Sequence, residues 1–183
     1  MTYKRSEISV PDGPLFSERL SFIKLSRADT NAMWDMVSSA DVMRYIPLEV
    51  ETDFEKWRGQ FYQELDAGER FKFFYGFKWR DPNANEKDIL GLVICRPTED
   101  EKYIELGYWV RRSFWGLGLA TEANLKMIEL AENTLYAPKK DHIAFVSIGN
   151  HASRHVLEKS GLVIAGEQNL NDDPCWVMRH ASD

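Results

Sequence analysis

Residues 109–123 read WVRRSFWGLGLATEA and join a strand-like run to the start of an amphipathic helix through a glycine-rich turn. Gly116 and Gly118 keep side chains out of this turn. The first turn of a helix leaves about four N–H groups unpaired and carries roughly half a positive charge. A strand, a glycine turn and a helix N-terminus in succession therefore favour the binding of a phosphate or pyrophosphate by main-chain amides.

Two glycines one residue apart are also typical of an ordinary tight turn, so the pattern alone leaves both interpretations open. The known nucleotide motifs fit it poorly. A P-loop requires GxxxxGK followed by Ser or Thr, and the dinucleotide fingerprint GxGxxG opens a βαβ unit, whereas the strand before Gly116 belongs to an expected antiparallel meander. The ligand of this turn is therefore expected to be of another class.

Three strand-like runs predict that meander. Residues 71–79 are rich in aromatic side chains and residues 89–95 read ILGLVIC, both with the composition of strands. Residues 81–87 (DPNANEK) between them have the composition of a hairpin loop. A third strand is expected over residues 103–110, where Gly107 interrupts the run and predicts a bulge or the close approach of another group.

Helix signals lie on both sides of the meander. Thr52 with Glu55 has the pattern of a capping box and precedes apolar residues at helical spacing, and Ser26 with Asp29 opens an earlier helix in the same way. From Gly118 onward, an apolar stripe predicts the strongest helix of the chain.

A strand, a short helix and two closing strands are expected towards the C-terminus. Residues 143–148 (IAFVSI) read as a buried strand, Asn150 as the cap of a helix that stops at Gly161, and residues 162–165 and 176–178 as the last strands. This order predicts an α+β protein with a mixed, mostly antiparallel, twisted sheet of about six or seven strands flanked by about four helices.

The chain has 183 residues, of which 44% are hydrophobic and 13% aromatic, and this is the composition of a packed globule. The length is typical of one domain, which we expect to span residues 1–183. The net charge of −6 argues against a nucleic-acid partner, because displacing the counterions of a nucleic acid takes a basic surface. A cationic partner is accommodated more easily.

No segment indicates a membrane or a metal site. The N-terminus lacks the apolar stretch of a signal peptide and no run reaches about 20 apolar residues, so we expect a cytoplasmic protein with no membrane association. Cys95 and Cys175 lie in or beside apolar runs without metal-ligand spacing, and buried free thiols are expected. His151 and His155 are four residues apart but lack a third ligand nearby, so we expect exposed histidines and no metal.

A family resemblance rests on two segments. Residues 105–123, ELGYWVRRSFWGLGLATEA, resemble the acyl-CoA signature of GNAT acetyltransferases, particularly the branch that acetylates ribosomal-protein N-termini. The superfamily pattern Gln/Arg-x-x-Gly-x-Gly/Ala aligns with residues 115–120, with Trp115 where Gln or Arg is usual. Residues 150–162, NHASRHVLEKSGL, are similar to the Asn-x-x-Ser/Ala…Glu-Lys-x-Gly-Phe segment of the family.

The resemblance covers most of the chain and implies the complete GNAT fold. It implies that the strand containing Gly107 and the next strand splay apart, with the pantetheine of acetyl-CoA between them. No metal is implied. The coenzyme-binding residues that it implies are Trp109, Val110, Arg111, Trp115, Gly116, Leu117, Gly118, Leu119, Ala120, Thr121 and Asn150.

Acetyl transfer to an amine requires a neutral amine and stabilisation of the departing thiolate. An alkyl amine has a pKa near 10.4, so its attack needs a base. Glu105 lies on the strand that resembles the catalytic strand of the family, and alternation places Glu105, Gly107 and Trp109 on one face. Glu105 is the candidate base, directly or through a water, although a half-buried structural carboxylate is an equal alternative.

Many GNAT enzymes place a tyrosine on the last helix as the acid for the thiolate, and the equivalent position here is Leu157. Ser153 matches the serine of the Rim-type branch, and its hydroxyl is expected to hydrogen-bond the coenzyme sulfur. Asn150 resembles the residue that bonds the amides of pantetheine, and this role is compatible with that of a helix cap.

The acceptor is a protein N-terminus or a small amine, and the sequence leaves both open. Its pocket is expected between the first helices and the loop before the last strand. A non-catalytic acyl-CoA-binding sensor is the alternative function, motivated by the missing tyrosine. The protein is expected to be a monomer or a homodimer. Candidates for the pocket walls are Trp34, Trp57, Phe61, Phe73, Tyr75 and Trp176.

Overall fold

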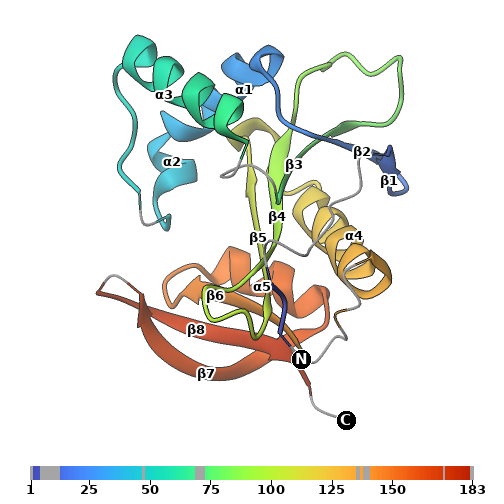
Figure 1. Ribbon diagram of the computed structural model, residues 1–183, viewed down its shortest axis with the longest axis vertical. Helices are drawn as coiled ribbons and strands as arrows, with labels where there is room; N and C mark the ends of the chain where they lie inside the picture. Colours follow the sequence, from blue (N-terminus) through green and yellow to red (C-terminus); the bar gives the residue numbers. More distant parts are fainter. Residues whose placement is uncertain are drawn as a thin grey trace.

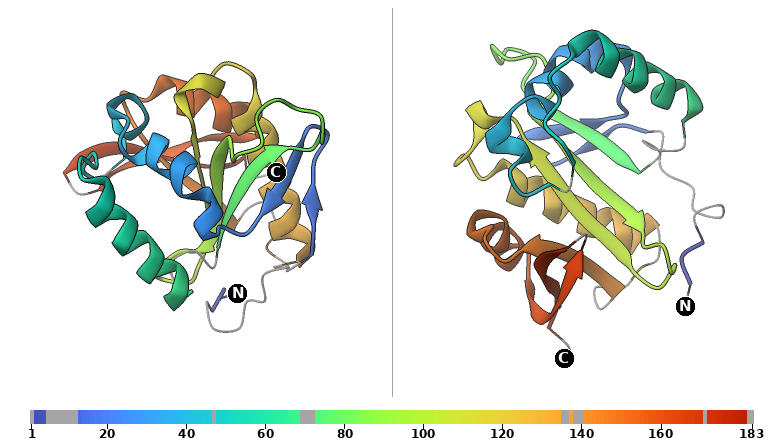
Figure 2. Two further views of the ribbon diagram at one scale, coloured as in Figure 1. Left: turned by 90° about the horizontal axis from the view of Figure 1, so that it is seen from above. Right: turned by 90° about the vertical axis from the view of Figure 1, so that its left-hand side faces the viewer.

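The computed structural model describes residues 2–4, 13–46, 48–68, 73–134, 137, 141–170 and 172–181. These residues form one eight-stranded mixed sheet in the order β1-β2-β3-β4-β5-β6-β8-β7, with helices on both faces (Figures 1 and 2). The α+β class predicted from the sequence is confirmed. The strand count exceeds the expected six or seven, and one of the eight strands, β1 (Leu15–Phe16), has only two residues.

Three helices of the N-terminal half cover one face of the sheet. The strand β2 (Leu20–Ile23) leads through a 3-10 turn, η1 (Arg27–Asp29), into α1 (Thr30–Val37), α2 (Ala40–Met43) and α3 (Phe54–Ala67). These helices bury apolar side chains against β3 and β4, including Met36, Trp57 and Phe61.

The two expected capping boxes had different outcomes. Ser26 and Asp29 form one, at η1. At α3 the cap is Asp53, whose carboxylate accepts from the Lys56 N–H at 3.0 Å, so the expectation for Thr52 was wrong by one residue. Thr52 and Asp53 each carry an oxygen acceptor. The extended backbone of Asp53 decides that its carboxylate, and not the Thr52 hydroxyl, reaches the unpaired N–H of Lys56.

The predicted meander consists of β3 (Phe74–Trp79), β4 (Gly91–Pro97) and β5 (Ile104–Val110), paired antiparallel. The register between β4 and β5 is continuous through Gly107, which faces Ile94, so the bulge expected there is absent. A close backbone approach occurs instead at Gly91, where a β-carbon would collide with the main-chain oxygen of Trp109.

The sheet opens between β5 and β6 (His142–Ser147), the only adjacent pair described as parallel. Pairing is confined to Ile104 with His142 and Glu105 with Ile143. Beyond these positions the strands continue to Val110 and Ser147 without partners in each other. The splay implied by the family resemblance is therefore present, and its vertex lies at residues 104 and 142.

The opposite face of the sheet carries α4 (Leu119–Thr134) and α5 (His151–Lys159). Both pack into a second core with Leu106, Ala123, Met127 and Leu157. The strands β7 (Leu162–Leu170) and β8 (Asp173–His180) close the sheet as a hairpin, with β8 between β6 and β7. Cys95 and Cys175 are buried free thiols, as expected. Within the described ranges, no helix is long and apolar enough to cross a membrane.

Candidate active site

The glycine turn and the start of α4 form an array of unpaired amides. After β5 the chain makes a 3-10 turn, η2 (Arg112–Phe114), and then passes through Gly116 and Gly118, whose φ angles are +77° and +75°. Glycine adopts this left-handed conformation without steric cost. In the described part of the chain, the N–H groups of residues 116 to 121 have no protein acceptor. Six consecutive free donors at the N-terminus of a 16-residue helix suit a pyrophosphate.

Arg19, from the β1–β2 turn, holds this array in place. Its Nε donates to the Glu122 carboxylate at 2.7 Å and its Nη1 to the Leu117 carbonyl at 3.1 Å. Glu122 also accepts from the Ser17 hydroxyl at 2.6 Å. Burial raises the pKa of Glu122, but the hydrogen bonds from Ser17 and Arg19 outweigh burial and lower it overall. The carboxylate stays ionised and anchors the first turn of α4 to the opposite edge of the sheet.

The residues that flank the turn differ in whether their side chains are free to contact a ligand. The Trp115 indole is 44% exposed, and its Nε1 donates to the Val110 carbonyl at 2.7 Å. The Arg111 guanidinium is engaged by Asp35 at 2.6 Å and Glu86 at 3.2 Å. The Arg111 N–H donates to the Leu90 carbonyl. Arg111 is therefore already paired on the side of α1, whereas Trp115 presents its ring to solvent beside the free amides.

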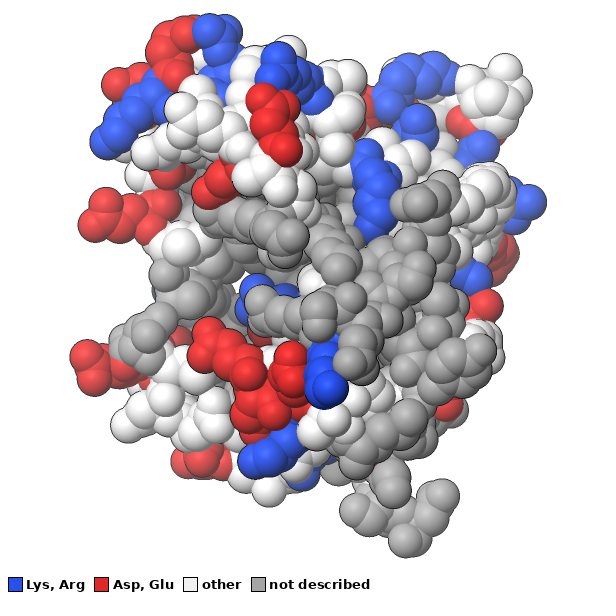
Figure 3. Space-filling model, viewed as in Figure 1, with Lys and Arg blue, Asp and Glu red and all other residues white. Residues whose placement is uncertain are grey.

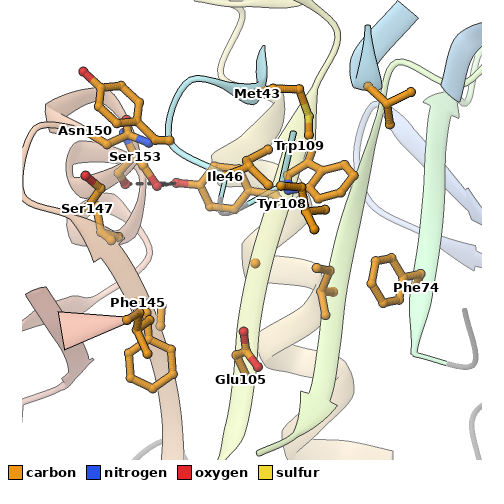
Figure 4. Close-up of a pocket in the computed structure, with 18 of the residues that line it drawn as sticks. Met43, Ile46, Phe74, Glu105, Tyr108, Trp109, Phe145, Ser147, Asn150 and Ser153 are labelled. Atoms are coloured by element: carbon orange, nitrogen blue, oxygen red, sulfur yellow. Dashed lines mark hydrogen bonds between the residues drawn. The ribbon is translucent and has the colours of Figure 1, made fainter. Parts of the chain in front are cut away.

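A cavity of about 600 Å³ occupies the opening between β5 and β6. Residues of β5, β6, α5 and the stretch from α2 into α3 line it, together with residues of α1, β3, β4 and β7 (Figure 4). Of the aromatic walls expected from the sequence, Trp57 and Phe61 line the cavity; Trp34, Phe73, Tyr75 and Trp176 are not among its described lining residues. The sequence interpretation missed Phe74, Tyr108 and Phe145, which lie in strands, and Tyr45, which follows α2. Their place at the cavity depends on where the sheet opens, which no local pattern of residues shows.

Glu105 lines the cavity one residue beyond the vertex of the splay. Both of its carboxylate oxygens accept from the Arg96 guanidinium, at 2.8 and 3.1 Å, across the β4–β5 pair. The side chain is 23% exposed. The Glu105 carboxylate is therefore held by a guanidinium at the wall of the cavity.

The first turn of α5 presents Asn150 and Ser153 to the cavity. Asn150 caps the helix, because its Oδ1 accepts from the Ser153 N–H at 3.0 Å, as the sequence predicted. Leu157, the position where the tyrosine acid was sought, is buried at 1% exposure. A tyrosine nevertheless reaches this site from another element, since the Tyr108 hydroxyl of β5 lies 2.8 Å from Ser153 Oγ. The residue pattern of the last helix gives no sign of a tyrosine that comes from β5.

Carboxylates dominate the charged lining of the cavity. Glu49, Glu51, Glu64 and Glu105 line it, and among the described lining residues Arg96 is the only cation. Figure 3 shows acidic side chains gathered beside a hollow in the molecular face. The described residues include no group of three or more potential metal ligands. His151 and His155 are exposed on α5.

Comparisons with known proteins agree with this geometry. Residues 19–163 match the family described as "Acetyltransferase (GNAT) domain". The chain is 26% identical over 160 residues to "Putative ribosomal N-acetyltransferase YdaF" of Bacillus subtilis, covering 84% of this chain and 76% of that protein. This relative supports the resemblance to the Rim-type branch.

Two solved structures share the fold. An acetyltransferase of the GNAT family from Bacillus anthracis has a TM-score of 0.75 at 21% identity, covering 91% of this chain and 96% of that one. The spermidine N-acetyltransferase of Vibrio cholerae, in complex with CoA and spermine, has a TM-score of 0.68 at 17% identity, covering 88% and 95%. The chain therefore belongs to the GNAT family of acetyltransferases and is an acetyl-CoA-dependent acyltransferase.

Proposed function

We propose that the protein transfers the acetyl group of acetyl-CoA to a primary amine by direct attack in a ternary complex. The proposal rests on one observation: β5 joins the two halves of the site. Its residues 105–109 line the cavity, and its end leads directly into the turn with six free amides. A ligand with a pyrophosphate at one end and a thioester at the other fits both halves at once.

Main-chain groups account for the proposed binding of the coenzyme. The amides of residues 116–121 bind the pyrophosphate, supported by the dipole of α4. The edge of β5 that faces the opening has no partner strand beyond Glu105, and it offers hydrogen bonds to the amides of pantetheine. Asn150 Oδ1 lies at the far wall of the same opening.

The chemistry follows from what surrounds the thioester. The charged amine first loses one proton through a water to Glu105, and its neutral nitrogen then attacks the thioester carbonyl. The C–S bond breaks with its electron pair on sulfur, and the second proton of the nitrogen passes to water. Ser153 Oγ donates a hydrogen bond to the departing thiolate. Arg96 fixes the orientation of the Glu105 carboxylate, because two parallel hydrogen bonds leave it no free rotation.

The charge of the cavity supports a cationic acceptor. Glu49, Glu51 and Glu64 stand on the α2–α3 side, where the amine approaches the thioester. An amine that carries a positive charge in solution is attracted to this rim and loses its proton only near Glu105. YdaF is described as a putative ribosomal N-acetyltransferase and the Vibrio cholerae structure holds spermine, so both peptide N-termini and polyamines belong in a first panel.

The test is thiol release from acetyl-CoA with peptides, polyamines and aminoglycosides as acceptors. Initial rates at varied concentrations of both substrates are expected to give intersecting reciprocal plots, as a ternary complex requires, and a ping-pong enzyme gives parallel ones. Calorimetry measures coenzyme binding on the same samples. Tight coenzyme binding without turnover on any amine would overturn this function and favour the acyl-CoA sensor.

A further inference from the structure

Tyr108 spans the opened part of the sheet. Its side chain extends from β5 to the first turn of α5, where its hydroxyl lies 2.9 Å from the Ser153 carbonyl oxygen and 2.8 Å from Ser153 Oγ (Figure 4). One hydroxyl thus contacts both the main chain and the side chain of a single residue. Both residues also line the cavity in which the thioester is proposed to lie.

The single proton of the Tyr108 hydroxyl allows two arrangements of these hydrogen bonds. A tyrosine hydroxyl has one proton to donate, and the Ser153 carbonyl oxygen can only accept. When Tyr108 donates to the carbonyl, the Ser153 hydroxyl donates to Tyr108, and its proton is not available to a ligand in the cavity. When Tyr108 donates to Ser153 Oγ, the proton of the serine becomes free to point elsewhere. An anion in the cavity favours the second state, because only that state offers it a donor.

A negatively charged sulfur is such an anion. Burial raises the pKa of Tyr108, and the hydrogen bond with Ser153 lowers it only in part. Tyr108 therefore stays protonated through neutral and mildly alkaline pH and keeps its ability to donate. Ser153 by itself is a weak donor, and a second hydrogen bond accepted by its oxygen strengthens the one that it donates.

We propose that Tyr108 is a positioning residue for thiolate departure: by donating to Ser153 Oγ it turns the serine hydroxyl towards the coenzyme sulfur. This inference rests on the proposed acetyl transfer and adds a residue to it. The electron pair of the broken C–S bond stays on sulfur, Ser153 holds the thiolate by a hydrogen bond, and the thiolate takes its proton from water after release. Tyr108 exchanges one acceptor for another and loses no proton.

The competing explanation for the same contact is a purely structural role, in which Tyr108 acts as a strut that holds the opening at its width. The two strands do not pair beyond residues 105 and 143, so a hydrogen bond from β5 to α5 also helps to hold the opening at its width. The two roles differ in what they affect. A strut changes coenzyme affinity, whereas a positioning residue changes the chemical step and acts only through the Ser153 hydroxyl.

The experiment is a double-mutant cycle of Tyr108→Phe and Ser153→Ala, measured by single-turnover acetyl transfer and by coenzyme calorimetry. Ser153→Ala is expected to slow transfer by about ten- to a hundredfold, because it removes a hydrogen bond to a charged group. Tyr108→Phe is expected to slow transfer by about three- to tenfold with unchanged acetyl-CoA affinity. In the Ser153→Ala background, Tyr108→Phe is expected to have no further effect, since its target is gone.

Tyr103→Phe is the matched control, because it makes the same change just before β5, where the ring lies under Arg179 and outside the cavity lining. It is expected to retain wild-type kinetics. Thermal melting and circular dichroism confirm that each variant is folded. Additive effects in the cycle, or a Tyr108→Phe loss confined to coenzyme affinity, would overturn the positioning role. A wild-type protein without turnover would instead overturn the proposed function.

Discussion

At the scale of single residues, the coenzyme turn depends on the absence of a side chain at Gly118. Gly118→Asp places a negative charge beside the amides proposed to bind the pyrophosphate, and Gly118→Asn is a nearly isosteric control with the same strain at φ +75°. The charge difference at close range corresponds to roughly 1–4 kcal/mol, so the Asp variant is expected to bind acetyl-CoA at least about fivefold more weakly than the Asn variant. Calorimetry measures both. Equal affinities would remove the turn from the coenzyme site.

The role of Glu105 is tested at the same scale. A general base contributes roughly 10²–10⁴-fold, so Glu105→Gln is expected to reduce the rate by about that factor at pH 7 and to recover part of it at higher pH, where more amine is already neutral. If the acceptor is an α-amino group with a pKa near 8, the loss is expected to be smaller.

The pH–rate profile with saturating acetyl-CoA measures both effects of Glu105→Gln. A partly exposed ion pair such as Arg96–Glu105 contributes about 0–1 kcal/mol to stability, so the variant is expected to fold. An unaltered profile would make Glu105 a structural partner of Arg96, the alternative that the sequence left open.

At the scale of elements, α4 is tied to the β1–β2 turn by Glu122. Loss of its charged hydrogen bonds to Ser17 and Arg19 in Glu122→Gln is expected to lower the free energy of unfolding by about 1.5–3 kcal/mol at pH 7. The pKa of Glu122 is lowered in the folded state. Its contribution to the free energy of unfolding is therefore present above its pKa in the unfolded chain, near 4.3, and is lost as the pH falls through its pKa in the folded protein.

Urea unfolding at pH 7 and pH 3 measures this difference. Glu129→Gln is the matched control on the same helix, since Glu129 pairs only with Lys126 at the surface and is expected to change stability by less than about 1 kcal/mol. A Glu122→Gln penalty that is equally large at both pH values would contradict the electrostatic explanation.

At the scale of the whole molecule, the vertex of the splay contains a buried histidine. His142 has no exposed surface, its Nε2 lies 3.0 Å from the Ala137 carbonyl, and burial lowers its pKa despite that hydrogen bond. His142 takes up a proton below about pH 6.5 in the unfolded chain and only at lower pH in the folded one, so stability is expected to fall as the pH drops from 7 to 5.

His142→Gln is expected to reduce that loss, because glutamine keeps a donor and does not titrate. His155→Gln, on the exposed side of α5, is the control and is expected to leave the loss unchanged. Urea midpoints at both pH values are the measurement. An identical loss of stability in His142→Gln and wild type would assign the pH dependence to other groups.

Signals within a few residues of one another were read well from the sequence. Ser26 and Asn150 cap the helices that they were expected to cap, and the glycine turn expected before α4 is present, with a left-handed backbone at both glycines. Capping and turn formation depend on groups three or four positions apart, and these are adjacent in the chain whatever the fold. The choice of Thr52 instead of Asp53 as the cap of α3 was wrong by one residue. This choice is also local, because the backbone angles at one residue decide it.

By itself, the sequence determined the α+β class, the glycine turn before α4 and the family, because each is written in contiguous residues. The tertiary structure alone decided that Arg96 engages Glu105, that Tyr108 reaches Ser153, and that Gly107 lies in an unbroken register. These contacts join residues that are far apart in the sequence. Their distance in space is set by the strand register and by the point at which the parallel pairing of β5 and β6 stops. That point depends on the packing of both cores against the sheet, and no local pattern of residues encodes it.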